Sequence, residues 1–171
     1  MKRFAIVATI LALISGFMLK GTFGHWIVVT GAGLYLGAPL ALFMTLWLVI
    51  SMKRTGGVPN GLKATSLFSI IVGGSLLLSL GAGTTIHYWE IQEARGYVAK
   101  MVPVLEEYQE KHGVYPQTLA DLSALRPPIL LRDSHSYSAG SDYFRFEYWD
   151  AAGMMDGYFF DSSNRQWTYF D

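Results

Sequence analysis

The sequence predicts an α+β protein with three transmembrane helices, the third continuing as a long amphipathic helix packed on a small antiparallel β-meander. Three observations predict this class. Long apolar runs fill the first half of the chain, a three- and four-residue periodicity follows them, and a two-residue periodicity ends the chain. We therefore expect a membrane domain at residues 1–89 and an external soluble domain at residues 90–171.

Two apolar runs are long enough to cross a bilayer. Residues 26–50 and residues 64–89 contain no charged residue, and about 20 apolar residues in a helix cross about 30 Å of hydrocarbon. A third run, residues 4–19, is shorter and follows two basic residues. It is either a retained span or a cleaved signal peptide. We prefer the span, because no A-x-A-like site follows the run and Lys20 comes immediately after it.

The basic residues predict the orientation. The loop between the first two runs holds only Lys20, whereas five basic residues lie at the N-terminus and between the second and third runs: Lys2, Arg3, Lys53, Arg54 and Lys63. The positive-inside rule places these five in the cytoplasm. We expect a bacterial inner-membrane protein with a cytoplasmic N-terminus and a periplasmic C-terminal domain.

The formal net charge of zero hides an asymmetry. Residues 1–89 contain six Lys and Arg and no Asp or Glu, whereas residues 90–171 contain seven Lys and Arg and thirteen Asp and Glu. An acidic external domain argues against nucleic acid as a partner. The chain has no cysteine, which excludes disulfides and thiolate metal sites.

Small residues recur every four positions in both long runs. Such residues let helix backbones approach closely, which favours helix association inside a membrane. The stripes are Gly33, Gly37 and Ala41 in one run and Ser75, Ser79 and Gly83 in the other. They serve either to pack the two spans on each other or to dock a span on another subunit. The partners we expect are the lipid bilayer and other membrane-protein subunits, and Pro39 predicts a kink in the second span.

His25 and His87 fall near the expected external ends of spans. A histidine pair at such positions could ligate a metal or haem, but we interpret both as interfacial polar residues bonded to water or backbone. The spans contain no Asp, Glu, Lys or Arg, which argues against a transporter.

Apolar residues continue at helical spacing beyond the third run, at Ala94, Val98, Met101, Leu105 and Tyr108. No Gly-, Pro- or Ser-rich linker intervenes, so we expect one helix over residues 64–112, ended by Gly113. A short helix is expected at residues 118–125. Alternation predicts strands at residues 144–149, 158–161 and 167–170.

The turn out of this helix resembles a known family. Residues 108–116 read Tyr-Gln-Glu-Lys-His-Gly-Val-Tyr-Pro. The segment is similar to type IV pilins and, more closely, to the major pseudopilins of type II secretion, in which a Tyr, a Gly and a Tyr-Pro pair mark the turn from the long helix into the head domain. The resemblance covers about residues 64–171 and assigns the motif to Tyr108, Gly113, Tyr115 and Pro116. Because two apolar runs precede this helix and its membrane half lacks glutamate, we expect a pilin-like head on a fixed anchor rather than a filament subunit.

No residue pattern typical of catalysis is present, so we expect no enzyme activity and no cofactor. Four acidic residues lie around the predicted strand loops, where the resembled pseudopilins often hold calcium: Asp142, Asp150, Asp156 and Asp161. They lack the spacing of an EF-hand loop, and we interpret them as turn caps, with calcium binding as the alternative. Glu106, Glu107 and Glu110 are interpreted as a solvated helix face.

Aromatic residues crowd positions 143–170, and alternation places only about half of them on one sheet face. The remainder form either an exposed contact surface or a surface covered by loops. We therefore predict a non-enzymatic scaffold or accessory subunit of an inner-membrane or envelope-spanning complex. The alternatives are a sensor domain for a small ligand or ion, and a component of secretion or pilus assembly.

Overall fold

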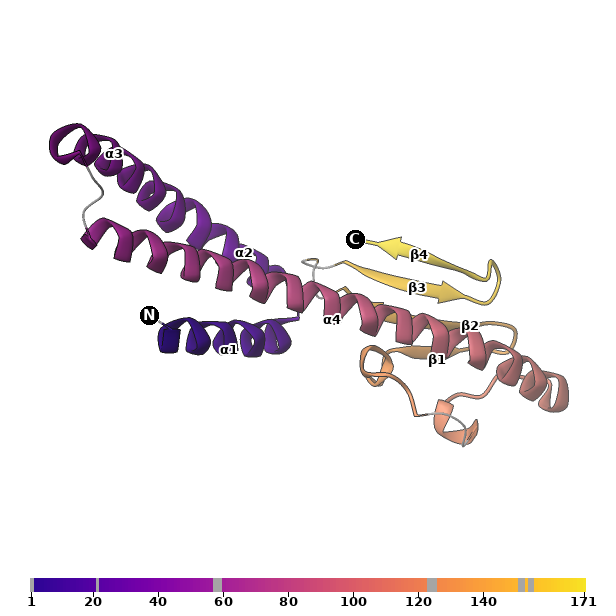
Figure 1. Ribbon diagram of the computed structural model, residues 1–171. Coiled ribbons are helices and arrows are strands. Elements are labelled where there is room, and N and C mark those ends of the chain that lie inside the picture. Colours follow the sequence, from indigo (N-terminus) through magenta and orange to yellow (C-terminus); the bar gives the residue numbers. More distant parts are fainter. Residues whose placement is uncertain (1, 21, 57–59, 123–125, 151–152, 154–155) are drawn as a thin grey trace. The chain divides into compact units, whose positions relative to one another are not determined.

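The computed structural model describes residues 2–20, 22–56, 60–122, 126–150, 153 and 156–171. The chain divides into two compact units, Met1–Ile86 and His87–Asp171. Helix α4 (Asn60–His112) runs through both units as one helix of 53 residues (Figure 1). The single long helix predicted over residues 64–112 is therefore confirmed.

The first unit contains three further helical segments besides the start of α4. These are α1 (Lys2–Leu19), α2 (Phe23–Ala32) and α3 (Ala38–Thr55), with the π-helical segment η1 (Gly33–Gly37) between α2 and α3. Figure 1 shows α1 and the α2–η1–α3 segment running alongside the first half of α4. Thr22 begins α2 as its N-cap, because its hydroxyl accepts a hydrogen bond from the amide of His25.

The number of spanning helices differs from the prediction of three. Among the described residues, one helix, α4, is long and apolar enough to cross a membrane, and Arg3–Leu19 is a shorter apolar helix. The run at residues 26–50 is divided among α2, η1 and α3. Pro39 accounts for the change of helix type, because it lacks an amide hydrogen and its ring would collide with the Tyr35 carbonyl four residues earlier. The wider π turn contains that carbonyl and makes room for the ring.

The second unit is a four-stranded antiparallel sheet with the second half of α4. The strands are β1 (Tyr137–Ala139), β2 (Phe144–Trp149), β3 (Gly157–Asp161) and β4 (Gln166–Phe170), and they neighbour one another in chain order. The antiparallel meander and its last three strands are confirmed. Strand β1 was not predicted, because its three residues are too few to show a two-residue period.

The core of this unit lies between α4 and one face of the sheet. Ala94, Val98, Met101 and Leu105 are all at most 1% exposed, so the predicted apolar face of the helix is confirmed. They pack with the inward residues of the sheet, Phe144, Phe146, Tyr148 and Phe160. Burial of several aromatic rings contributes strongly to the hydrophobic stabilisation of so small a unit.

Gly113 ends α4, as predicted. Its φ of +77° lies in the left-handed region, and its amide donates to the Gln109 carbonyl at 2.8 Å, which closes the last turn. The chain then forms two short 3₁₀ segments, η2 (Leu119–Leu122) and η3 (Ile129–Leu131). A 3₁₀ turn thus replaces the short α-helix expected at residues 118–125, of which residues 123–125 lie outside the described part of the chain.

Candidate functional site

The strand register separates the sheet aromatics into two faces. Residues directly opposite each other in an antiparallel pair share a face. Trp149, Gly157 and Phe170 are mutually opposite across β2, β3 and β4, as are Glu147, Phe159 and Thr168. These residues lie on the face away from α4, because the alternate residues of β2 form the core.

Three aromatic side chains on this outer face form a contiguous strip, which we call the outer aromatic surface: Trp149, Phe159 and Phe170. Phe170 lies at its centre, with ring centroids 5.4 Å from Trp149 and 6.2 Å from Phe159. Trp149 is 61% exposed, and the two phenylalanines are half-buried. A Cβ atom on Gly157 would lie 2.4 Å from the Phe170 ring, so glycine at this position lets the ring lie flat on the sheet.

Arg145 continues the strip toward the β3–β4 hairpin. Its guanidinium carbon lies 4.7 Å from the centroid of the Phe159 ring, a cation–π contact. The same guanidinium donates to Asp161 at 3.0 Å. The outer face therefore changes along the strands from exposed tryptophan at one end to a paired charge at the other.

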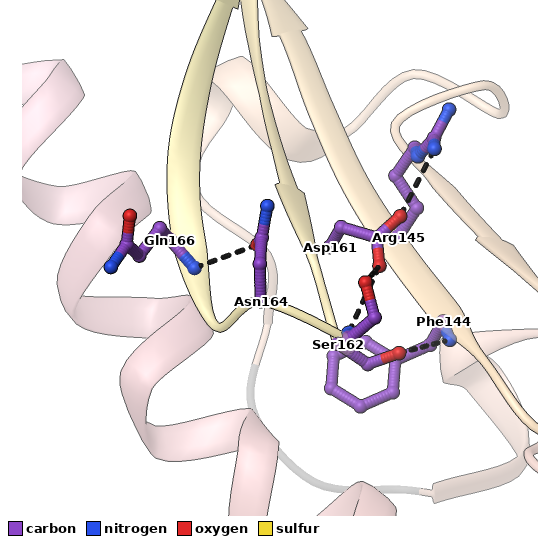
Figure 2. A network of polar contacts seen from close by, with 7 residues as sticks. Phe144, Arg145, Asp161, Ser162, Asn164 and Gln166 are labelled. Carbon is purple, nitrogen blue, oxygen red and sulfur yellow. Dashed lines mark hydrogen bonds and ion pairs between the residues drawn. The ribbon is translucent and has the colours of Figure 1, made fainter.

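The β3–β4 hairpin holds this polar end in place, as Figure 2 shows. Asp161 Oδ1 accepts hydrogen bonds from the amide and the hydroxyl of Ser163 at 2.9 and 2.7 Å. The Ser162 hydroxyl accepts from the amide of Phe144 at 3.0 Å, which fixes β2 against the turn. The hydrogen bonds from Ser163, followed by that from Arg145, hold the pKa of the Asp161 carboxyl below its ordinary value. Turn capping was the role predicted for Asp161.

The inner face also contains a cation. Arg95 of α4 places its guanidinium 5.4 Å from the Tyr158 ring and 5.8 Å from the Trp167 ring. The hydroxyl of Tyr148 is buried beside them, close to the Arg95 guanidinium. Burial raises the pKa of Tyr148, and the neighbouring Arg95 partly offsets that rise. Helix and sheet are thus joined here by aromatic and cationic contacts.

His87 joins the end of the sheet. Its Nε2 atom lies 2.8 Å from Asp150 Oδ1, just after β2. The sequence reading of His87 as an interfacial residue bonded to water or backbone, and of Asp150 as a turn cap, missed this pair. Sequence contained no signal for it, because the two residues are 63 positions apart.

His25 belongs to a hydrogen-bonded cluster inside the first unit. Its Nε2 lies 3.0 Å from the Ser79 hydroxyl, which lies 2.6 Å from the hydroxyl of Ser15. His25 is 2% exposed and Ser79 is 4% exposed. The cluster links α1, α2 and α4 through polar side chains. The water or backbone partner expected for His25 is therefore replaced by a serine from another helix.

The small-residue stripe of α4 faces α1. A Cβ atom on Gly16 would lie 2.5 Å from the Ser79 carbonyl oxygen, and it would lie 3.3 Å from the amide nitrogen of Gly83. The stripe members Ser79 and Gly83 are buried, and Ser75 is half-buried. The glycine that lets the two helices approach closely is therefore Gly16, which was not among the predicted stripe residues.

The other predicted stripe borders an apolar groove. Gly33 and Gly37 of η1 are exposed and line a groove of about 570 Å³ together with Leu40, Phe68, Gly73 and Leu76. Ala41 lies in α3. The two glycines of this stripe therefore border the groove.

The pilin-like motif residues lie where α4 enters the sheet unit. Tyr108 is half-buried and stacks on His112 with ring centroids 4.1 Å apart. Tyr115 is buried against Phe144 at 5.0 Å. The carbonyl of the buried Pro116 accepts a hydrogen bond from the Tyr137 hydroxyl at 2.9 Å. Burial raises the pKa of Tyr137. All these contacts are internal to the unit and serve its folding.

The other acidic residues are dispersed. Asp142 is exposed and accepts from the Ser141 hydroxyl, and Asp156 forms a hydrogen bond with Tyr169 that raises the pKa of Tyr169 to about 12. Glu106 is half-buried and pairs with Arg165, whereas Glu107 pairs with Lys111 in solvent. Within the described ranges, no group of three or more His, Asp or Glu side chains is placed to hold a metal ion.

No protein-family model, curated protein or solved structure matches this chain.

Proposed function

We propose that this protein is a non-enzymatic, membrane-anchored scaffold or accessory subunit of an inner-membrane or envelope-spanning complex. One observation carries the proposal. The sheet packs its core residues against α4, and yet its other face displays the outer aromatic surface, in which Arg145 lies over the Phe159 ring at 4.7 Å. Apolar surface that is not needed for the core of a small unit is typical of a contact region, and aromatic residues with a neighbouring arginine are enriched in such regions.

The anchor in this proposal is the uncharged first part of α4. Its length and composition suffice to cross a membrane. The five basic residues then lie in the cytoplasm, and the pilin-like head lies in the periplasm of a bacterial cell.

Two surfaces are available to partner subunits. The distal part of the outer aromatic surface, Phe159 with Arg145 stacked on its ring, offers an apolar and cationic contact above the membrane. Inside the membrane, the groove beside Gly33 and Gly37 has the small side chains that admit another helix.

A second candidate function is a sensor for a small ligand, and a pocket favours it. A hollow of about 290 Å³ is lined by Glu93, Gly96, Tyr97, Lys100, Arg126 and Pro128. Convergent charged groups of both signs could orient a small polar ligand. The third candidate, a component of secretion or pilus assembly, is supported by the resemblance of residues 108–116 to pseudopilins.

The deciding experiment purifies the tagged full-length protein in mild detergent and identifies co-purifying subunits by native mass analysis. The variant Phe159→Ala removes the distal aromatic ring, and Thr168→Ala is the control, because Thr168 lies directly opposite Phe159 on the same face. We expect stoichiometric partners with the native chain and the control, and loss of most of them with Phe159→Ala. Recovery of the native chain alone would contradict the scaffold proposal. Small polar molecules would then be screened for binding to the native chain and to Lys100→Ala. Binding that the variant loses would support the sensor function.

A further inference from the structure

His87, the first residue of the sheet unit, directly follows the apolar segment of α4 in the chain. Residues 64–86 of α4 carry no charge and extend about 34 Å at 1.5 Å per residue, which matches the hydrocarbon thickness of a bilayer. The next residue is His87, and its hydrogen bond to Asp150 places the end of β2 at that level. If α4 crosses the membrane as proposed, this end of the sheet lies where hydrocarbon gives way to headgroups.

Exposed tyrosine and tryptophan side chains gather at this level. Tyr88 and Trp89 of α4 are 58% and 67% exposed, and Trp149 and Tyr169 of the sheet are 61% and 50% exposed. We call these four residues the membrane-proximal rim. Tryptophan and tyrosine are enriched at membrane interfaces, because their rings are apolar and their N–H or O–H groups bond to headgroups and water.

The opposite end of the sheet has different side chains. Ser163, Asn164, Arg165 and Gln166 are exposed in and beside the β3–β4 turn, and Arg165 pairs with Glu106. The strands of five residues separate the two ends by about 16 Å. A surface that recognised only another protein would not require this gradient along the helix axis, whereas a domain resting on a bilayer does.

The charged residues near the rim indicate which class of lipid headgroup it would meet. Four carboxylates lie near the rim. Asp150 is hydrogen-bonded to His87 and Asp156 to Tyr169, whereas Glu90 follows Trp89 in the chain and Asp171 acts on the charge of Tyr169. No lysine or arginine belongs to the rim. Anionic lipid would be repelled by this acidic unit, so the compatible surface is one of zwitterionic headgroups.

We propose that the membrane-proximal rim (Tyr88, Trp89, Trp149 and Tyr169) inserts into the zwitterionic headgroup region of the same bilayer that α4 crosses, and so seats the sheet unit on the membrane. The inference rests on the proposed membrane span. Contact with lipid is made by the sheet itself and not only by the helix. The distal part of the outer aromatic surface remains in the aqueous phase.

The test places the full chain in phosphatidylcholine–phosphatidylethanolamine nanodiscs that contain lipids brominated close to the headgroup. Three single-tryptophan variants retain Trp149, Trp89 or Trp167, with phenylalanine at the other tryptophan positions. We expect Trp149 and Trp89 to be quenched by the brominated lipid at least twofold more than the inner-face Trp167, and Trp149 to be protected from aqueous iodide.

Quenching of Trp89 but not of Trp149 by the lipid would overturn the inference and leave the membrane span intact, whether Trp149 is accessible to iodide or covered by protein. If Trp89 also escapes the lipid quencher, the proposed span itself fails. Because the chain has no cysteine, single substitutions provide a second readout without removing tryptophans. Nitroxide labels can be attached at Asp171→Cys, next to Phe170, and at Asn164→Cys. By electron paramagnetic resonance, the first label should be accessible to oxygen dissolved in the lipid phase, and the second should be accessible to a water-soluble nickel complex. Equal accessibility of both labels to nickel would contradict the inference.

Discussion

His87 Nε2 lies 2.8 Å from Asp150 Oδ1, and the two side chains are only 8% and 19% exposed. The contact joins the first residue of the sheet unit to the residue that follows β2. Because α4 is one continuous helix through His87, the contact attaches the end of the sheet directly to the segment proposed to leave the membrane. A hydrogen bond between a histidine and a carboxylate is short and strong when water is excluded.

The variant Asp150→Asn should destabilise the sheet unit. It keeps the shape of the side chain and removes its charge, and a hydrogen bond to a charged group contributes about 1.5–3 kcal/mol. We expect the free energy of unfolding to fall by about 2 kcal/mol, measured by denaturant titration of the full chain in detergent with near-ultraviolet circular dichroism. Glu107→Gln is the control, because its pair with Lys111 is 64% exposed on both sides. Equal effects of the two variants would contradict a specific role for the His87–Asp150 contact.

The variant Ser79→Ala should loosen the first unit. It removes the shared partner of His25 and Ser15 and leaves the buried His25 Nε2 without its hydrogen bond. The expected loss is about 1–2 kcal/mol, measured by unfolding in mixed micelles of increasing SDS content. Ser69→Ala is the matched control, because within the described part of the chain the Ser69 hydroxyl bonds to the Thr65 carbonyl of its own helix. If Ser69→Ala lowers the stability as much as Ser79→Ala, the hydrogen-bonded cluster of His25, Ser79 and Ser15 makes no specific contribution to stability.

Gly16→Ala should separate α1 from α4. The added methyl group would lie 2.5 Å from the Ser79 backbone oxygen, which cannot move without moving α4, and overpacking of this kind costs about 1–3 kcal/mol. The readout is the rate of disulfide formation between Ser15→Cys and Ser79→Cys, measured by labelling the thiols that remain free. This rate should fall markedly in Gly16→Ala. Gly81→Ala is the control, because nothing lies within 4 Å of its added methyl group. Unchanged cross-linking in Gly16→Ala would show that the helices do not pack this closely.

Two glycines of the sheet unit should respond in opposite directions to alanine. Gly113 has a φ of +77°, where a side chain costs about 1–2 kcal/mol, so Gly113→Ala should lower the midpoint of thermal unfolding. Gly96 lies inside α4 with open space around its Cβ position, and alanine there should add about 0.5–1 kcal/mol of stability. Calorimetry of both variants measures the difference. A stabilising effect of Gly113→Ala would contradict the left-handed conformation of Gly113 at the end of α4.

Asp161 should make stability depend on acid. Hydrogen bonds from Ser163 and then from Arg145 lower its pKa in the folded state, so its stabilising effect is complete above the ordinary aspartate pKa of about 3.9. The effect is lost as pH falls through the lower pKa of the folded state. Asp161→Asn should therefore be less stable than the native chain at pH 7, and the difference should shrink below about pH 4. Denaturant midpoints measured from pH 7 to pH 2 test this, and a difference constant with pH would contradict it.

Local features of the fold followed directly from the sequence. The length of α4 is set by an uncharged run joined to a three- and four-residue apolar period, and its end is set by Gly113. The strands β2, β3 and β4 followed from alternation. Each of these features depends on side chains close together in the chain, and their physical causes act over one or two turns or a few strand residues.

The contacts of the candidate sites were decided by tertiary structure alone. His25 finds Ser79 and His87 finds Asp150 across 54 and 63 residues, and each pairing depends on which faces of helix and sheet meet. Gly16 is a packing glycine only because α4 approaches it, and Pro39 lies in an uninterrupted helical segment only because a π turn accommodates its ring. Sequence periodicity states which residues share a face, whereas the partner of that face is chosen by packing between segments distant in the chain. For the same reason, composition showed a surplus of aromatics, and only the strand register assigned Trp149, Phe159 and Phe170 to the outer face.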